Sequence, residues 1–260
     1  MTTLTVRSDI DWTAEEAATA VLLVRVADSA GHRRVYEDLQ VVGAEVEDHG
    51  PRRGGGSRPL RLHATPGPVE LRYTAKVDLE PVPLDEEVTL PSLAELDLDL
   101  LSWTLPSRYC PADVLAPTAE HLFGDLERTG ALLEQVRAWV EANIAYVPGT
   151  SNVHTAADET MLRRTGVCRD LAHLTTTLLR GLGVPTRIVS AYALDLEPPD
   201  FHAVVEAHDG RTWRLLDATG LAPIGTLVRI ATGRDAADIA WGTTEGPLTL
   251  ERLDVEVTRA

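Results

Sequence analysis

The sequence predicts an α+β protein, with an N-terminal antiparallel β-sandwich over residues 1–95 and a core over residues 96–260 in which helices pack on an antiparallel sheet. Two observations indicate this division. Apolar and polar residues alternate in the first hundred residues, which is the period of a half-buried strand, whereas helical spacing of three and four begins only after residue 130. Strand-forming segments then return after residue 185.

The clearest strand covers residues 68–80. Apolar side chains occupy every second position from Val69 to Leu79, with polar or charged side chains between them. This alternation is typical of a sheet with one face in the core and one face in water. Shorter strands are predicted at 20–26, 35–42 and 60–64, and together the strands favour an antiparallel sandwich.

Residues 77–107 are expected to connect the two domains. This segment holds eight acidic residues, no Lys or Arg, and several prolines. Because like charges repel and proline cannot donate a hydrogen bond to a sheet, a regular strand or helix is not favoured here.

The core is predicted to begin with two helices. Apolar residues from Leu132 to Ile144 recur at intervals of three and four, which predicts a helix of about five turns. The sequence TAAD at 155–158 matches the pattern of a capping box and predicts a short helix that ends near Arg164.

A third helix follows, with leucines along one face from Leu171 to Leu182 and a stop signal at Gly183. Cys168 therefore lies in its first turn. Strands are predicted after this helix at 186–194, 202–207, 212–216 and 248–257.

Composition and charge argue against some classes of binding partner and indicate where in the cell the protein works. The 260 residues include 24 Lys and Arg against 40 Asp and Glu, a formal charge of -16, which argues against partners such as nucleic acid or an anionic membrane surface. The chain shows neither a secretory leader pattern nor an apolar run long enough to span a bilayer, and it has only two cysteines, Cys110 and Cys168. We expect a cytoplasmic protein in which a bridge between these cysteines is not favoured.

Cys168 is the strongest candidate for chemistry. A helix N-terminus carries partial positive charge and favours the thiolate, which is the form that attacks a carbonyl. Such a thiolate also needs an imidazole to exchange protons with, and the imidazole needs a third group that fixes its orientation.

His202 and Asp217 are the candidates for these two roles. His202 lies 34 residues after Cys168 and Asp217 lies 15 residues after His202. If the two strands pair around the turn at Asp209 and Gly210, the midpoint of the two positions is 209.5, and the two residues lie opposite each other.

These segments resemble a known family. GVCRDLAHLTTTLLRGLGVPTRIVSAY at 166–192 and FHAVVEAHDGRTWRLLDATG at 201–220 look like the transglutaminase-like superfamily, in its bacterial cysteine protease branch. The flanking pieces LPSRYCPAD and TAADETMLRRTGVCRD are similar to this branch as well. The resemblance covers residues 100–245 well, and the first hundred residues only in general character.

The resemblance implies a papain-like core with Cys168 as nucleophile, His202 as acid and base, and Asp217 as the group that orients the histidine. It gives no clear counterpart for the side chain that stabilises the oxyanion, and Tyr146, Trp139 and Asn152 are all candidates; the backbone N–H of Cys168 is a surer donor. We expect no cofactor and no metal, and in particular no calcium dependence, because no Asp-rich ligand loop of EF-hand spacing is present.

The expected function is acyl transfer from a peptide or protein amide, most simply hydrolysis by a cysteine peptidase or amidase. Three alternatives stay open. A primary amine as acceptor would make the protein a transglutaminase, and loss of thiol reactivity would favour a non-catalytic protein-binding module. A zinc site that uses Cys168 and His202 is disfavoured, because no further Cys or His shows ligand spacing.

Overall fold

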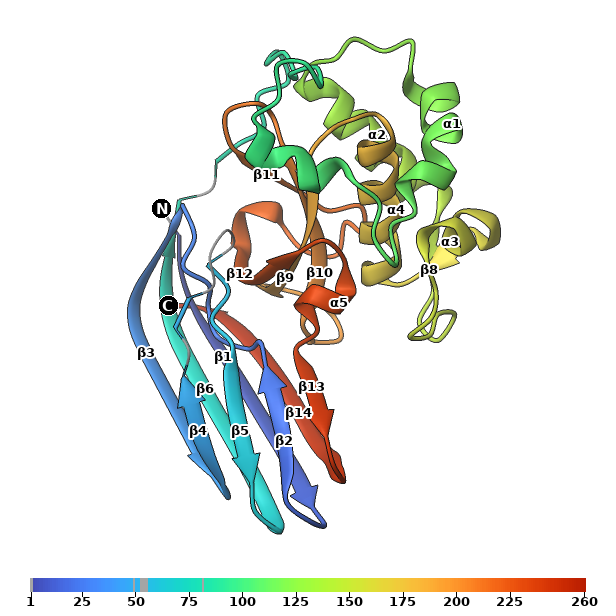
Figure 1. The fold of residues 1–260 in the computed structure, drawn as a ribbon. Helices are drawn as coiled ribbons and strands as arrows, with labels where there is room; N and C mark the ends of the chain where they lie inside the picture. The colour runs from blue at the N-terminus through green and yellow to red at the C-terminus, as the bar shows by residue number, and fades with distance from the viewer. Residues whose placement is uncertain (1, 49, 52–55, 81) are drawn as a thin grey trace.

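The computed structural model describes residues 2–48, 50–51, 56–80 and 82–260. It consists of a β-sandwich and a mixed core of helices and strands, which lie at the lower left and upper right of Figure 1. Both chain ends lie on the sandwich, where Ala260 N–H donates to the carbonyl of Thr3 at 3.1 Å. The predicted α+β class is confirmed.

The sandwich consists of two four-stranded antiparallel sheets. The first has the order β14-β1-β6-β3, with β1 Thr2–Ala14, β3 His32–Val42, β6 Gly67–Leu79 and β14 Leu248–Arg259. The second has the order β13-β2-β5-β4, with β2 Ala18–Leu22, β4 Ala44–Asp48, β5 Leu60–Ala64 and β13 Gly242–Glu245.

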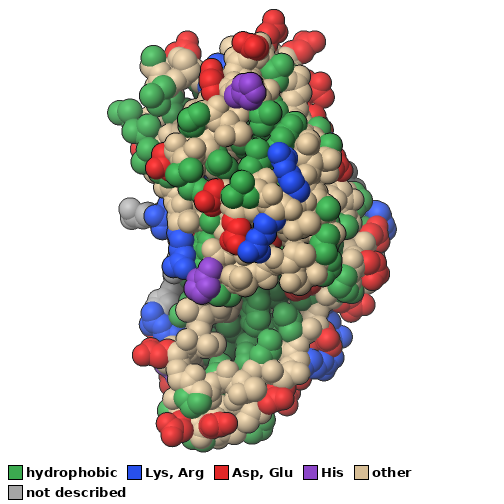
Figure 2. Space-filling model, turned by 90° about the vertical axis from the view of Figure 1, so that its right-hand side faces the viewer, with side chains coloured by type: hydrophobic (Ala, Val, Ile, Leu, Met, Phe, Trp, Pro, Cys, Tyr) green, Lys and Arg blue, Asp and Glu red, His purple; other side chains and the backbone are tan. Residues whose placement is uncertain are grey.

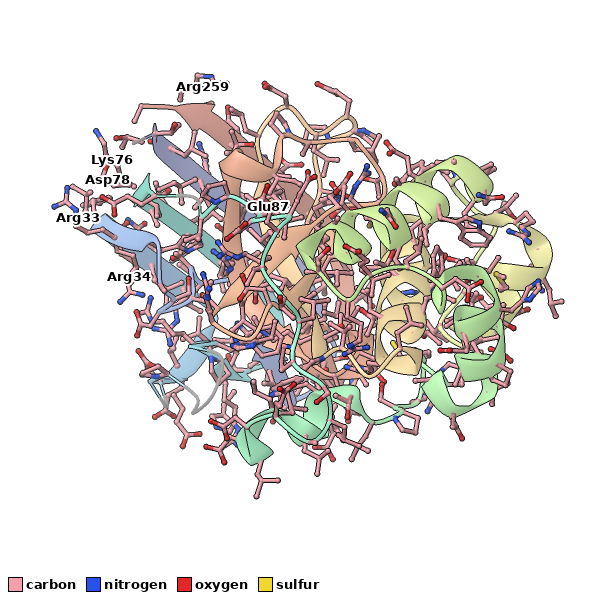
Figure 3. All side chains as sticks on the ribbon, turned by 90° about the horizontal axis from the view of Figure 1, so that it is seen from above. Arg33, Arg34, Lys76, Asp78, Glu87 and Arg259 are labelled. Atoms are coloured by element: carbon pink, nitrogen blue, oxygen red, sulfur yellow. The ribbon has the colours of Figure 1, made fainter. Side chains whose placement is uncertain are left out.

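Strand β6 follows the predicted alternation. Every second side chain from Val69 to Leu79 is buried, at 2% exposure or less. The edge strand β3 is joined to β6 by an ion pair between Arg33 and Asp78, which lie together at the end of the sheet in Figure 3. The apolar face of β6 is thus committed to the sandwich core, while charges pair along its rim.

The last two strands lie in the sandwich. We expected residues 96–260 to form one core, but β13 pairs with β2, and β14 pairs with β1 along almost its whole length, from Leu4 with Arg259 to Ala14 with Leu248. The physical reason is that β1 and β2 would otherwise be unpaired sheet edges with apolar inner faces. In the sequence, the core therefore lies between two groups of sandwich strands, β1 to β6 before it and β13 and β14 after it.

The core contains five α-helices among the described residues: α1 Ala112–Phe123, α2 Gly130–Asn143, α3 Ala157–Arg163, α4 Cys168–Gly181 and α5 Ala236–Ile239. Helix α2 has 14 residues, about four turns rather than the five expected. Two short 3-10 segments, η1 Leu98–Thr104 and η2 Ile224–Thr226, complete the helical elements.

The core sheet has the order β11-β10-β9-β12 and is antiparallel, with β9 Thr186–Ala193, β10 His202–His208, β11 Trp213–Leu216 and β12 Leu227–Gly233. A small parallel pair, β7 Ala145–Tyr146 and β8 Thr165–Gly166, lies beside the start of α4. Helix α4 packs on the four-stranded core sheet, against β9 and β10, and the leucines predicted on its inner face are buried.

Sandwich and core meet along a close-packed seam. Tyr192 of β9 donates its hydroxyl to the carbonyl of Val24 at 2.6 Å, and its ring stacks with that of Tyr73 at 6.5 Å. Ala27 N–H donates to the carbonyl of Arg229 on β12 at 2.8 Å. The sandwich therefore supports the sheet that carries the candidate site residues.

The surface reflects the excess of acids. In the view of Figure 2, acidic side chains are scattered over the top and along the lower rim of the molecule, and hydrophobic side chains show in the hollow of the lower half. Within the part of the chain that the structure describes, none of the helices is long and apolar enough to cross a bilayer.

Candidate active site

The start of α4 is built by its neighbours in sequence. Val167 is extended, with φ -114° and ψ -179°, and Cys168 is the first helical residue. The carboxylate of Asp170 accepts a hydrogen bond from Val167 N–H at 2.9 Å, which satisfies one of the free amides of the first turn. The Cys168 N–H has no acceptor among the described residues, and the thiol is only partly buried.

Gly166 and Arg169 hold this turn in place. A Cβ at position 166 would lie 2.7 Å from the Cβ of Asp170, so the absence of a side chain makes room for the capping carboxylate. Arg169 pairs with Asp170 at 3.0 Å and donates to the carbonyl of Asn152 at 2.7 Å. The loop before α3 is thereby tied to the helix start that presents Cys168.

The structure brings His202 and Asp217 together. His202 Nε2 lies 2.9 Å from Asp217 Oδ2, and the two residues are 1% and 4% exposed. Cys168 also raises the pKa of His202, which places the thiol beside the imidazole, while Asp217 occupies Nε2. All three predicted site residues therefore belong to one cluster, at the first residue of α4, the first residue of β10 and the position after β11.

The strand register differs from the prediction by two residues. Val205 pairs with Leu216, and His208 with Trp213, so the connecting loop spans 209–212 and the ladder, if extended, places Thr219 opposite His202. The carboxylate of Asp209 fixes this loop by accepting from the N–H groups of residues 211 and 212, each at 2.8 Å. A shift of two keeps Asp217 on the same face as His202, as a diagonal neighbour.

The cluster favours a charged histidine. Burial is the largest single influence and acts to lower the pKa of His202, yet the hydrogen-bonding and charge interactions with Asp217 and Cys168 together outweigh it and raise the pKa to about 9. The imidazolium is therefore the main form at neutral pH, stabilised by the buried Asp217 carboxylate.

Thr219 is a functional candidate that sequence reasoning missed. Its backbone N–H and its hydroxyl both donate to Asp217 Oδ1, each at 2.8 Å, and its hydroxyl lies 3.4 Å from His202 Nε2. Asp217 thus uses one oxygen for His202 and the other for Thr219. A Thr two residues after the acid was the available signal, because the observed register, if extended, places it opposite His202.

Of the three side chains considered for the oxyanion, Tyr146 is the one beside the thiol. It lies on β7, paired with Gly166 of β8, and burial followed by the charges of Cys168 and Asp200 raises its pKa. Trp139 instead packs against Phe123, at 6.0 Å between ring centroids. The Asn152 side chain accepts from the N–H of residue 154 at 2.8 Å.

Two other residues of the region serve packing. Cys110 is fully buried, and burial raises the pKa of its thiol to about 12; both cysteines are free. His173 is fully buried and stacks on Tyr109 at 5.2 Å, and burial lowers its pKa to about 4. Within the described ranges, no three His, Cys, Asp or Glu side chains are grouped so that they could hold a metal ion.

Comparison with known proteins supports a family assignment. The model of the transglutaminase-like superfamily matches residues 118–218, which include all three clustered residues. A crystal structure described as "a Putative Cysteine Protease from Cytophaga hutchinsonii" is 35% identical, with a TM-score of 0.92 over 99% of this chain and 90% of that chain.

Two further proteins are more distant. "Uncharacterized protein ML0607" of Mycobacterium leprae (strain TN) is 28% identical over 188 residues, and the match spans 66% of this chain and 66% of that protein's length. The periplasmic domain of TgpA from Pseudomonas aeruginosa is 16% identical over 86% of this chain and 94% of that domain, with a TM-score of 0.43. The family-model match and the Cytophaga hutchinsonii structure, which agrees along almost the full length, show that this chain belongs to the transglutaminase-like superfamily.

Proposed function

We propose that this protein is a cysteine peptidase or amidase that cleaves a peptide or isopeptide-like amide through a thioester intermediate. The observation that carries the proposal is the cluster of Cys168 at the start of α4, His202 and Asp217, in which His202 hydrogen-bonds to Asp217 and both neighbours raise the pKa of His202. A thiol at a helix N-terminus beside a carboxylate-oriented imidazole is the arrangement that nucleophilic acyl transfer requires.

In the first half of the reaction, Cys168 Sγ bonds to the amide carbon and the carbonyl π electrons move onto oxygen. The C–N bond then breaks, and the His202 imidazolium gives its Nδ1 proton to the departing amine. The product is a thioester between the acyl group and Cys168. In the second half, His202 takes a proton from a water molecule whose oxygen bonds to the thioester carbon, and the C–S bond breaks. The carboxylic acid leaves, and the Cys168 thiolate and the His202 imidazolium are restored.

Two donors are assigned to the oxyanion. The Cys168 N–H has no acceptor among the described residues and points from the helix start, where the dipole favours negative charge. The Tyr146 hydroxyl stays protonated at neutral pH because its pKa is raised. Asp217, held by Thr219, keeps His202 oriented through both steps.

The first test is the rate of iodoacetamide labelling, with both cysteines followed separately by mass spectrometry. The buried Cys110 serves as an internal control for unfolding. We expect Cys168 to label rapidly at neutral pH and His202→Ala to slow that labelling about tenfold or more, because the variant loses the imidazolium that stabilises the thiolate. If Cys168 is labelled equally slowly in the wild type and in His202→Ala, the proposal fails and the non-catalytic protein-binding module is the remaining alternative.

The acyl acceptor is tested by incubating a glutamine-containing protein such as casein with the wild-type enzyme, with and without a fluorescent primary amine. Release of new amino termini supports hydrolysis, whereas incorporation of the amine into intact casein supports a transglutaminase. Cys168→Ala is the control in both assays. The cytoplasmic location remains part of this proposal, tested by fractionation of the native host.

A further inference from the structure

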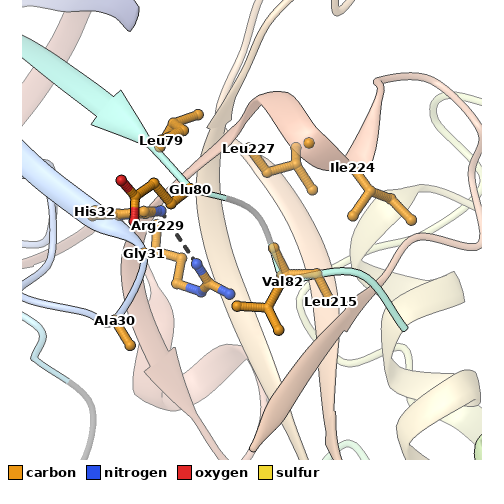
Figure 4. Close-up of a pocket in the computed structure, with 11 residues that line it drawn as sticks. Ala30, Gly31, His32, Leu79, Glu80, Val82, Leu215, Ile224, Leu227 and Arg229 are labelled. Carbon is orange, nitrogen blue, oxygen red and sulfur yellow. Dashed lines mark hydrogen bonds between the residues drawn. The ribbon is translucent and has the colours of Figure 1, made fainter. Parts of the chain in front are cut away.

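The connector from the sandwich to the core, residues 82–107, is fixed to the core along its length. Val82 lines a small cavity in the seam together with Leu215 of β11, as Figure 4 shows. Arg214 of the same strand donates to the carbonyl of Pro83 at 2.6 Å. Further along, two main-chain hydrogen bonds of 2.8 Å join the connector to the residues at the start of α2. The connector is therefore part of the core surface, and its side chains have defined positions.

This connector leaves some leucines in water although it buries others. Val88, Leu90 and Leu96 are buried, at 8% exposure or less. The exposed leucines are Leu93, Leu98, Leu101 and Leu105, at 66%, 82%, 38% and 52%. Leu98 and Leu101 are three residues apart in η1, and side chains at this spacing lie on the same face of a 3-10 helix. Exposed groups of large apolar side chains are typical of surfaces that bind a partner.

Acidic side chains alternate with these leucines in the sequence. Residues 82–107 contain six Asp or Glu and no Lys, Arg or His. Asp97 and Asp99 flank Leu98, and Glu95 precedes it by three residues; all three acids are exposed. Glu95 accepts from the hydroxyl of Ser92 at 2.7 Å, and neither Glu95 nor Asp99 forms an ion pair among the described residues. The apolar face of η1 therefore has a negatively charged border.

An acidic hollow of about 490 Å³ opens beside Leu93. Its lining includes Pro91 and Glu95, each two residues from Leu93 in the chain, and the charged side chains of Asp85, Glu87, Asp209 and Arg211. Asp209 is paired with Arg214 at 2.6 Å, and Arg211 lies 4.0 Å from Asp85. Glu87, labelled in Figure 3, has no ion pair among the residues that the structure describes. Glu87 and Glu95 thus give the hollow an excess of negative charge.

We propose that the leucine face of η1 and the acidic hollow together bind a basic amphipathic segment of another protein. Apolar side chains of the partner lie on Leu98 and Leu101, and a Lys or Arg of the partner enters the hollow beside Glu87 and Glu95. Charge disfavours two other occupants. A second copy of this chain, with its net charge of -16, would bring acids against acids, and an anionic membrane would be repelled. The proposal is independent of the proposed function.

The probe is a fluorescein-labelled helical peptide of about 14 residues that contains only leucine and lysine, with leucine along one helix face. A peptide in which glutamate replaces every lysine is the reference for charge. Binding to the full chain is followed by fluorescence anisotropy at low and at physiological salt. We expect saturable binding of the lysine peptide, weaker at the higher salt, and binding of the glutamate peptide at least about tenfold weaker.

Variants of the chain then locate the binding surface. Leu98→Ser removes the most exposed leucine of the face, and Leu162→Ser on α3 is its matched control, since the two side chains are 82% and 84% exposed. Helix α3 lies away from η1 in Figure 1. We expect Leu98→Ser to bind the lysine peptide about tenfold more weakly, because a leucine no longer becomes buried, and Leu162→Ser to bind like the wild type.

The hollow has its own pair of variants. Glu87→Gln should weaken binding of the lysine peptide a few-fold, and Glu251→Gln, at an exposed position of β14, should leave it unchanged. Lack of saturable binding to the wild type, equal weakening in Leu98→Ser and Leu162→Ser, or an unchanged Kd in Glu87→Gln would each overturn the proposal.

Two further measurements separate the other occupants of this face. Sedimentation of the wild type, but not of Leu98→Ser, with neutral phosphatidylcholine vesicles would overturn the proposal in favour of a lipid surface. A wild-type dimer that Leu98→Ser converts to a monomer in sedimentation velocity would overturn it in favour of a second copy. Because every readout is binding or assembly, a failure here leaves the labelling test of Cys168 unaffected.

Discussion

The sandwich and the core differ in what they bury. The inner face of β6 is apolar from Val69 to Leu79, and its charged neighbours Arg33 and Asp78 pair at the rim. The candidate site buries three polar side chains together, those of Asp170, His202 and Asp217, at 0%, 1% and 4% exposure, whereas the buried acids Asp9 and Asp78 of the sandwich each pair with an exposed arginine. Burying polar groups is costly unless every one is hydrogen-bonded, so their concentration in the core marks the place where chemistry is assembled. Substitutions in the core site should change turnover, and those in the sandwich should change stability.

The sharpest form of this comparison uses the two cysteines. Cys168→Ala should lower amide turnover by ~10³ or more with little change in stability, because it removes the nucleophile. Cys110→Ala should keep turnover and lose stability, since Cys110 is fully buried. Turnover and urea denaturation of both variants check this. A Cys168→Ala protein with substantial turnover would remove Cys168 from the mechanism.

Substitution of a buried leucine in the sandwich should have the opposite effect to Cys168→Ala, a loss of stability without a loss of turnover. Leu71→Ala on β6 should lower the free energy of unfolding by about 3 kcal/mol, because Leu71 is fully buried between two strands. Leu250→Ala on β14, where the side chain is 44% exposed, is the matched control and should cost far less. Both should keep kcat at a temperature where they are folded. A kcat loss in Leu71→Ala would show that the two regions are not separable in this way.

Thr219 tests whether the orientation of Asp217 matters to the chemistry. Thr219→Val keeps the shape but loses the hydroxyl that donates to Asp217 Oδ1 at 2.8 Å, and kcat should fall about tenfold. Thr219→Ser keeps the hydroxyl and should restore most of the rate. The variants are compared by kcat, KM and thermal stability. Equal kcat values for Thr219→Val and Thr219→Ser would assign Thr219 a purely structural role.

The smallest expected effect is the pH dependence. The pKa of His202 is raised to about 9, so the imidazolium that protonates the leaving amine persists to higher pH than for a free histidine. The acylation rate should therefore hold through neutral pH and fall as pH rises through about 9. Single-turnover rates between neutral and alkaline pH measure this limb. In Thr219→Val the limb should move to lower pH, because Asp217 stabilises the imidazolium less well.

The elements that sequence could predict are those whose signal is local. Strand β6 alternates without interruption, and α4 carries its leucines at helical spacing, so both were predicted close to their observed bounds. Strand β1 was missed because Ser8 and Asp9 interrupt its apolar pattern; Ser8 is buried where it meets the Tyr192 hydroxyl, at 3.1 Å. Helix α1 was missed because Pro117 lies inside it. The tertiary contact of Ser8 explains the first case, and a proline that the helix tolerates explains the second. Neither can be recognised from the local sequence pattern.

The candidate site shows the same limit. Spacing and residue type were enough to single out Cys168, His202 and Asp217, and the structure clusters them, while their roles stay a proposal. The hairpin register was wrong by two, because the length of the 209–212 loop depends on the Asp209 carboxylate. Thr219 was missed for that reason. A register error of one would have placed Asp217 on the other face.

The return of β14 to the sandwich has a consequence for biosynthesis. Leu4 pairs with Arg259, so strand β1 leaves the ribosome some 255 residues before its outer neighbour exists. From the completion of β6 until β14 is made, β1 presents an unpaired edge beside β6, and by the end of this interval the core, including Cys168, has already been made and can fold. A stalled or proteolysed chain that lacks residues 248–259 would keep the complete cysteine cluster on a sandwich with one open edge, a template for intermolecular strand pairing. Arrival of the last strand thus closes the sheet edge that a finished core would otherwise leave open to pairing with another chain.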